Sequence, residues 1–327
     1  NWVSRDVSKH KSILRIGDLG GTGNGQVHGV SEYLTPLLID GKFQLDSGHY
    51  GTIKFTHVDG IIYPDRRVDL TGSKLVWEND WPVDKAFVQF QFGDKIHPLT
   101  KIINFPLIIL NNGETRAVAN GYIDSSTQLV QFSFKSDNAR MQDLPAVKKE
   151  RSLLDGTMVL NGTITGKMDK VLVTTRFSSP AFRVYDTAVP ENIEGIVSTE
   201  NKQMQFTANG AGYAIRGNID YRKPDPTIII SSDLRKARLI FPAQAARTQD
   251  LKGSMDGTFL VSGHYSNLRF NGYIAGISAL SGEGNPIQFS SGTVFGQFQN
   301  NLQNGSLDWQ LVEIRYSPEN KSRTTRL

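Results

Sequence analysis

The feature of this sequence that most constrains its fold is a regular alternation of apolar and polar residues over short runs. Val88, Phe90 and Phe92 fall on one side of an extended chain, and Gln89 and Gln91 fall on the other. Because the side chains of a β-strand point alternately to opposite faces, a period of two predicts strands with one apolar face. Comparable runs occupy residues 130–135, 171–177, 204–208, 259–265, 268–274 and 307–315.

Turn signals lie between many of these runs. The chain contains 31 glycines, and Asn-Gly or Asp-Gly pairs begin at positions 59, 112, 161, 209, 271 and 304. Such pairs favour tight hairpin turns, so we expect short strands joined by tight turns.

Evidence for helices is thin. Segments 29–38, 138–154 and 233–251 contain helix formers, but Pro36, Pro145 and Pro242 restrict each of them to short helical pieces. We therefore predict an all-β fold, mostly antiparallel, with a few short helices.

The sequence also contains an internal repeat. Residues 120–124 (Asn-Gly-Tyr-Ile-Asp) recur 96 positions later as 216–220, and residues 154–162 recur 101 positions later as 255–263. A weaker third copy begins at residues 40–45. A repeated strand unit predicts a sheet that grows by adding copies. We divide the chain into an N-terminal β region at 1–115, a β repeat unit at 116–215, and a second unit with C-terminal strands at 216–327.

Composition excludes several classes of protein. Hydrophobic residues make up 38% of the 327 residues, and the apolar run Pro106–Leu110 is far shorter than the ~20 residues of a membrane-spanning helix. There is no cysteine, hence no disulfide or thiolate metal site. The net charge of +4 is spread along the chain without a basic stripe, so we expect no nucleic-acid partner. The chain begins without methionine, and we interpret it as a processed or excised piece.

The search for catalytic motifs finds none. The six histidines lack the spacing of a zinc protease, and no Gly-x-Ser-x-Gly elbow occurs. His49 and His57 could approach each other across a hairpin near Asp46 or Asp59, but ordinary strand histidines are the expectation there. The glycine-rich segment 17–25 lacks the Gly-Lys-Ser/Thr of a phosphate loop, so we interpret it as a turn or edge closure. We expect no enzyme activity, no catalytic residue, no metal and no cofactor.

A family resemblance follows from the repeat. Residues 251–263 (Leu-Lys-Gly-Ser-Met-Asp-Gly-Thr-Phe-Leu-Val-Ser-Gly) and then 268–274 resemble the repeating unit of AsmA/TamB-like envelope proteins. Residues 153–177 are similar and residues 40–75 loosely so, and the likeness covers roughly 115–300. The sequence departs from the family in lacking an amino-terminal membrane helix and in its last residues, 321–327. It therefore resembles an internal fragment or a divergent member.

The resemblance implies a long, curled β-sheet whose apolar groove shelters phospholipid or other acyl chains during transport between membranes and outer-membrane biogenesis. It places the protein in the periplasm or cell envelope of a diderm bacterium, with inner- and outer-membrane proteins as further partners. The predicted inward-facing residues of the groove floor are Phe132, Phe134, Val171, Val173, Met204, Phe206, Tyr213, Ile215, Phe259, Val261, Phe270 and Ile274.

Other folds and functions fit the same alternation. The apolar face could instead close as a β-sandwich or barrel. The chain would then be a surface binding module, an adhesin or host-protein-binding lipoprotein, with contacts carried by loops such as residues 77–82 (Trp-Glu-Asn-Asp-Trp-Pro). A structural viral or phage β-protein is a third reading. An open apolar face favours the groove, and a closed core favours the binding module.

Overall fold

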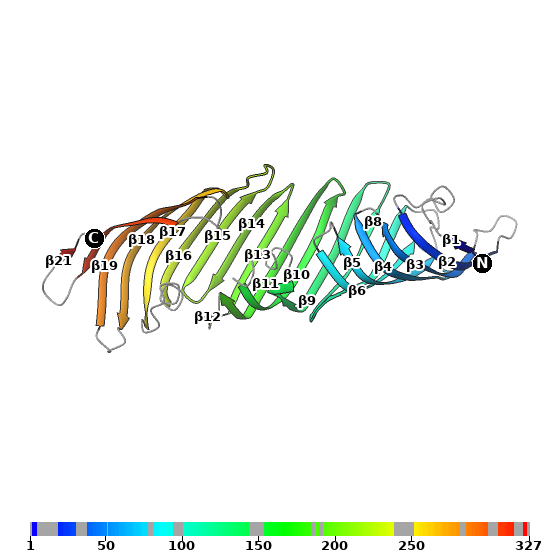
Figure 1. Cartoon of the computed structure of the whole chain (residues 1–327), viewed down its shortest axis with the longest axis horizontal. Helices are drawn as coiled ribbons and strands as arrows, with labels where there is room; N and C mark the ends of the chain where they lie inside the picture. Colours follow the sequence, from blue (N-terminus) through cyan, green and yellow to red (C-terminus); the bar gives the residue numbers. More distant parts are fainter. Residues whose placement is uncertain are drawn as a thin grey trace. The chain divides into compact units, whose positions relative to one another are not determined.

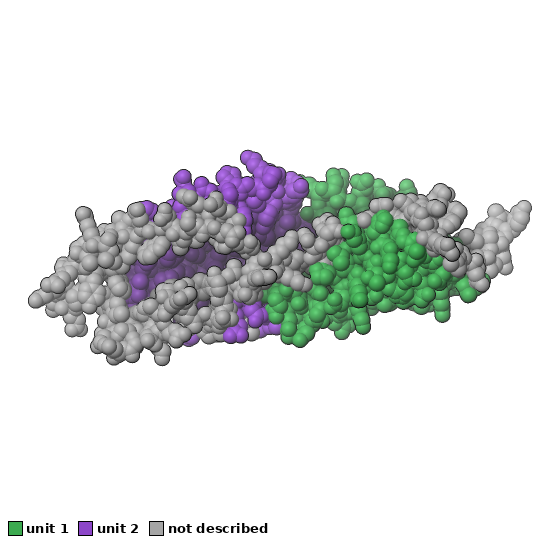
Figure 2. All heavy atoms as spheres, viewed as in Figure 1, with its two compact units in different colours: residues 1–149, 159–171 green, residues 150–158, 172–327 purple. Residues whose placement is uncertain are grey.

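The structure, a computed structural model, is built almost entirely of antiparallel β-strands, so the predicted all-β fold is confirmed. It describes residues 2–4, 19–30, 38–50, 52–77, 81–93, 101–143, 154–184, 187–189, 192–238, 252–280, 286–299, 307–316 and 323–325. The chain divides into two compact units, coloured separately in Figure 2. Unit 1 comprises Asn1–Lys149 and Val159–Val171, and unit 2 comprises Glu150–Met158 and Leu172–Leu327.

Unit 1 is an antiparallel meander, in which each strand pairs with the next along the chain (Figure 1). Its strands are β1 (Trp2–Ser4), β2 (Leu19–Val30), β3 (Leu38–Tyr50), β4 (Ile53–Ile62), β5 (Arg67–Trp77), β6 (Trp81–Phe92), β7 (Ile102–Asn112), β8 (Thr115–Asp124) and β9 (Leu129–Arg140). β9 is followed by β10 (Leu154–Lys167) and β11 (Lys170–Val184), and each of these two strands contributes residues to both units.

Unit 2 continues the same pattern. β11 pairs with both β12 (Thr187–Val189) and β13 (Ile193–Glu200), and the later strands pair in chain order. These strands are β14 (Gln203–Gly210), β15 (Tyr213–Asp220), β16 (Thr227–Arg238), β17 (Lys252–His264), β18 (Asn267–Leu280), β19 (Pro286–Gln299), β20 (Leu307–Tyr316) and β21 (Arg323–Thr325). The described sheet does not close into a barrel.

Where the structure describes the three segments expected to contain short helices, it shows strands and one 3₁₀ turn. Residues 233–238 continue β16 and pair with β17 on either side of a bulge at 235–236, because strand pairing and the burial of Ala237 outweigh the helix propensity of Lys and Arg. Gly29 and Val30 end β2. Residues 138–140 end β9, and a single 3₁₀ turn follows at Met141–Asp143. Leu38 begins β3 and Leu154 begins β10, and the other parts of the three segments, including the helix expected after Pro145, lie outside the described residues.

The six predicted glycine turns have different outcomes. Gly113 does form the β7–β8 turn, with φ of 56° and its N–H donating to Asp84 at 2.8 Å. The turn expected at Gly210 lies two residues later, at Gly212. Three of the predicted turn glycines, Gly60, Gly162 and Gly272, instead lie inside strands. The last pair, at 304–305, lies outside the described residues.

The internal repeat falls on corresponding strands. Residues 120–124 end β8 and 216–220 end β15, while 154–162 begin β10 and 255–263 lie in β17. Between these anchors, β9 and β16 end in the related sequences Asn-Ala-Arg and Lys-Ala-Arg. The alanines, Ala139 and Ala237, are both fully buried. The two copies therefore share both their order of strands and a small buried residue at the same point.

Candidate functional site

Nine of the twelve predicted groove residues lie on one face of unit 2. Directly paired residues of an antiparallel sheet share a face, so the strand registers show which side chains lie together. One cross-strand row passes from β11 to β19 through Thr175, Val197, Phe206, Gly217, Ile230, Val261, Phe270 and Gly296. This row is apolar or glycine at every position except Thr175.

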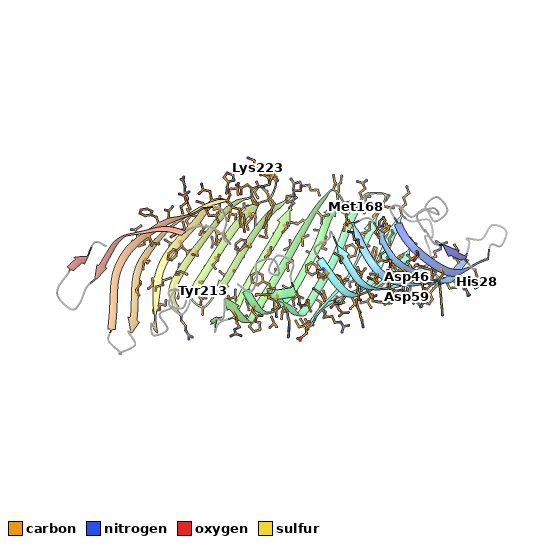
Figure 3. All side chains as sticks on the ribbon, viewed as in Figure 1. His28, Asp46, Asp59, Met168, Tyr213 and Lys223 are labelled. Carbon is orange, nitrogen blue, oxygen red and sulfur yellow. The ribbon has the colours of Figure 1, made fainter. Side chains whose placement is uncertain are left out.

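The neighbouring rows extend this face on both sides. They contain the other predicted residues of unit 2, which are Val173, Met204, Tyr213, Ile215, Phe259 and Ile274. Glycines and aliphatic residues occupy most of the remaining positions, with Thr199 and Ser232 as polar exceptions. We call this surface, formed by the four rows, the apolar face of unit 2. Tyr213, which lies on it, is labelled in Figure 3.

Among the described residues, no second sheet packs against the apolar face. All nine predicted residues are only half-buried, whereas the side chains alternating with them on β14, such as Gln205 and Thr207, are exposed. Only two hydrophobic side chains of this face are fully buried among those that the structure describes, Ile228 and Leu268. A sandwich interior would bury most of the inward residues. The unequal exposure of the two faces indicates that the sheet of unit 2 curls toward its apolar side.

Phenylalanine rings lie over glycines of the adjacent strand on this face. In unit 2 the cross-strand pairs are Phe177–Gly195, Phe206–Gly217 and Phe259–Gly272. A Cβ placed on any of these glycines would come closer than 3 Å to the facing ring. The rings therefore lean across the sheet instead of standing upright. Gly272 was predicted to form a turn, and nothing in the sequence indicated that Gly195 or Gly217 belongs to the site.

Unit 1 contains the other three predicted residues. Phe132 pairs with Gly121, which in turn pairs with Phe105, and the Phe105 and Phe132 ring centroids are 5.3 Å apart. Phe134 lies against Gly162 of β10. Val171 is half-buried on β11.

The first strands of unit 1 have a denser core than unit 2. Leu45, Phe55 and Val58 are fully buried in one cluster, against which Phe43 and Leu70 pack. Val68 and Ala86 are also buried. Half-buried apolar residues become common on β7 to β9. Within unit 1, therefore, the open apolar surface lies on the later strands.

The opposite face of unit 2 has a different chemical character. A hollow of about 520 Å³ lies on β13 to β16, and several hydrogen-bonding side chains line it, among them Ser198, Gln205 and Arg216. Ile196 and Ile229 are its exposed apolar residues. This face offers hydrogen-bonding groups instead of a continuous hydrocarbon surface.

His57 is held between two carboxylates in unit 1. Its Nδ1 lies 2.5 Å from Asp46 Oδ1, and its Nε2 lies 2.9 Å from Asp59 Oδ2 (Figure 3 labels both aspartates). The hydrogen bond to Asp46 is the largest cause of a raised His57 pKa, and Asp59 raises it further. An imidazolium donates from both nitrogens, whereas a metal ligand needs a free lone pair on one of them. The arrangement is that of a charged hydrogen-bonded cluster.

Two other predicted loops have a simple outcome. Leu19–Val30, which includes most of the glycine-rich segment, is strand β2 and pairs with β3, so its amides belong to the sheet ladder. Gly17 and Asp18 lie outside the described residues. Trp77 and Trp81 pair at the ends of β5 and β6, while their side chains and residues 78–80 lie outside the described part.

No family model, curated protein or solved structure matches this chain. Among the described segments there is no helix long and apolar enough to cross a membrane.

Proposed function

We propose that this protein is a non-enzymatic, AsmA/TamB-like component of the cell envelope whose apolar face shelters acyl chains of phospholipids during transport between membranes. The observation that carries the proposal is the cross-strand row that is apolar or glycine from Val197 on β13 to Gly296 on β19. It lies on a half-buried face of unit 2 against which no second sheet packs among the described residues. Soluble proteins rarely leave a large contiguous apolar surface without a ligand or partner for it.

The length of the rows supports a path rather than a pocket for one chain. From β13 to β18 there are five strand spacings of ~4.8 Å each, or about 24 Å. One leaflet of a bilayer's hydrocarbon core is ~15 Å deep, so an acyl chain covers about three spacings. A chain lying across the strands could therefore move along a row without leaving apolar surface.

The energetics fit reversible binding. Complete burial of a methylene contributes ~0.8 kcal/mol, and a chain lying on an open face buries only one of its sides. Each methylene then gains about half that amount. The free energy of burial is then sufficient to keep an acyl chain out of water. A shift by one strand changes it little, because the next strand offers the same apolar surface.

The proposal is tested by native mass spectrometry of the chain after incubation with vesicles of phosphatidylethanolamine and phosphatidylglycerol. We expect bound phospholipid on the unchanged protein. Phe206→Glu and Val261→Glu each place a charge on the apolar face and should remove most of that lipid. Leu260→Glu is the matched control, because Leu260 is an exposed apolar residue beside Val261 on the opposite face.

The outcome that would contradict the proposal is an unchanged protein that remains free of lipid in the presence of vesicles. Equal loss of lipid from Val261→Glu and Leu260→Glu would also contradict it, because the apolar face would then have no special role. The first of these results would favour a surface binding module. Circular dichroism of each variant serves as the control that tests whether the sheet is retained.

A further inference from the structure

We propose that the glycines beneath the phenylalanine rings set the depth of the lipid path, so that Phe206–Gly217 and its counterparts act as residues that decide whether an acyl chain fits. This inference rests on the proposed function. It assigns a role to glycines that otherwise contribute no side chain to the face.

The geometry at Gly217 is the clearest case. The three atoms nearest to a Cβ built on Gly217 all belong to the Phe206 ring, with Cε1 and Cζ the closest. These atoms form the far end of the ring, so the ring extends across the strand over the glycine. A ring lying in this way fills the space of a missing side chain and adds little height to the floor.

The same arrangement recurs in both units. The three nearest atoms at Gly60 are all from Phe43, and those at Gly162 are all from Phe134. At Gly272 the ring of Phe259 is again nearest, with Val294 beside it. Gly195 differs, because a Cβ there would also meet the Thr207 carbonyl oxygen, which cannot move aside. Gly60, Gly162 and Gly217 are therefore positions at which the nearest atoms that must respond to a substitution all belong to the ring.

A methyl group on Gly217 should lift the ring without unfolding the sheet. The Phe206 ring can rotate about its side-chain bonds, and the space into which it can rise is the open apolar face. Gly217→Ala thus keeps the face apolar and even improves strand propensity. The substitution reduces the space above the floor. A raised ring excludes about two methylenes of a bound chain, each buried on one side only, which weakens binding roughly fourfold.

A second substitution separates depth from any other effect of the methyl group. Leucine at position 206 has no ring to be lifted. Phe206→Leu therefore serves as its own reference, and adding Gly217→Ala to Phe206→Leu should weaken binding no further. Asn218→Ala, next to Gly217 on the opposite and exposed face, is the matched control and should have no effect.

The experiment is a titration of the full chain and these variants with a single-chain fluorescent fatty acid, alongside thermal unfolding of each. The expected result is roughly fourfold weaker binding in Gly217→Ala, and no further loss when Gly217→Ala is added to Phe206→Leu. Unchanged affinity in Gly217→Ala with a shifted Tm would overturn the inference, because the pair would then serve stability alone, while the proposed function would stand. Absence of binding by the unchanged protein would overturn the proposed function itself. Should Gly217→Ala fail to fold, Gly162→Ala beneath Phe134 asks the same question in unit 1.

Discussion

At the scale of single residues, His57 shows how a charge is held on an exposed face of this sheet. Asp46 lies on the strand beside it and Asp59 two residues along its own strand, and Gln44 donates to Asp59 at 2.9 Å. The aspartates face each other across the imidazole, so its positive charge offsets their mutual repulsion. On the β5 side His57 pairs with Ser73, a neutral residue that adds no second positive charge next to the imidazolium.

The raised pKa of His57 predicts a pH-dependent stability with a definite sign. A group whose pKa is higher in the folded than in the unfolded state stabilises the fold fully below its unfolded pKa of ~6.5, and that stability is lost as pH rises through the folded pKa. We expect unfolding free energy to fall by about 0.5 kcal/mol over that range, the size typical of exposed ion pairs. Chemical denaturation between pH 5 and 9, on the order of one pH unit per step, measures it.

The control for this prediction is His57→Gln, which keeps one amide donor but cannot titrate. Its unfolding free energy should lack the decline that the unchanged protein shows above the histidine's folded pKa. Identical pH profiles for the two proteins would mean that the cluster does not stabilise the charged imidazole.

At the scale of strands, two alanines of unit 2 can be compared, one at a buried position and one at an open position. Ala237 is fully buried at the end of β16, whereas Ala208 is half-buried on the apolar face, between Gly195 and Ile215. A larger side chain must force its neighbours apart at the first site. At the second it can extend into the open space above the sheet.

Leucine at these two positions should therefore have very different costs. We expect Ala237→Leu to lower the free energy of unfolding by about 1–3 kcal/mol through overpacking. Ala208→Leu should change it by no more than about 0.5 kcal/mol, as at a surface site. Urea denaturation of both variants gives the comparison. A large cost at Ala208 would indicate that the apolar face is covered.

The strands could be predicted from the sequence because their alternation directly reflects two faces of unequal polarity. The nine groove residues of unit 2 were predicted to share a face, and their registers place them there. The role of Gly60, Gly162 and Gly272 could not be predicted, since an Asn-Gly or Asp-Gly pair is a turn signal unless a ring lies over it. Which ring does so depends on the cross-strand register, and local sequence does not specify that register.

The short helices show the reverse error. Segment 233–238 contains Lys and Arg, which favour helices, but the backbone N–H groups of these residues find other partners. The Arg235 N–H donates to the Gly212 carbonyl, and the Lys236 N–H donates to the Asp256 carboxylate. The cluster around His57 was only partly visible in the sequence. Alternation places Asp46 and His57 on facing strands, but the sequence alone could not tell an ion cluster from a metal site.

At the scale of the whole molecule, both units are built from a single antiparallel layer. In unit 2 one face of that layer is mostly apolar, and the other combines exposed polar side chains with scattered apolar residues such as Ile229 and Leu260. A layer of this kind must leave its apolar side to a ligand, a partner or solvent, because no second sheet packs against it among the described residues. The denser core at β3 to β6 and the open rows of unit 2 show that the same alternation can produce either outcome. The strands β3 to β6 and the rows of unit 2 differ in the size of their side chains and in the position of their glycines.

The most direct test of the central claim, an open apolar face that takes up acyl chains, is thiol labelling, which is clean because the chain has no cysteine. Val261→Cys reports on the apolar face, and Leu260→Cys reports on the opposite face of the same strand. Without lipid, both thiols should react readily with a water-soluble maleimide. With phospholipid vesicles, Val261→Cys should become protected while Leu260→Cys stays reactive. A Val261→Cys thiol that is unreactive without lipid, or that reacts equally with and without it, would contradict the account.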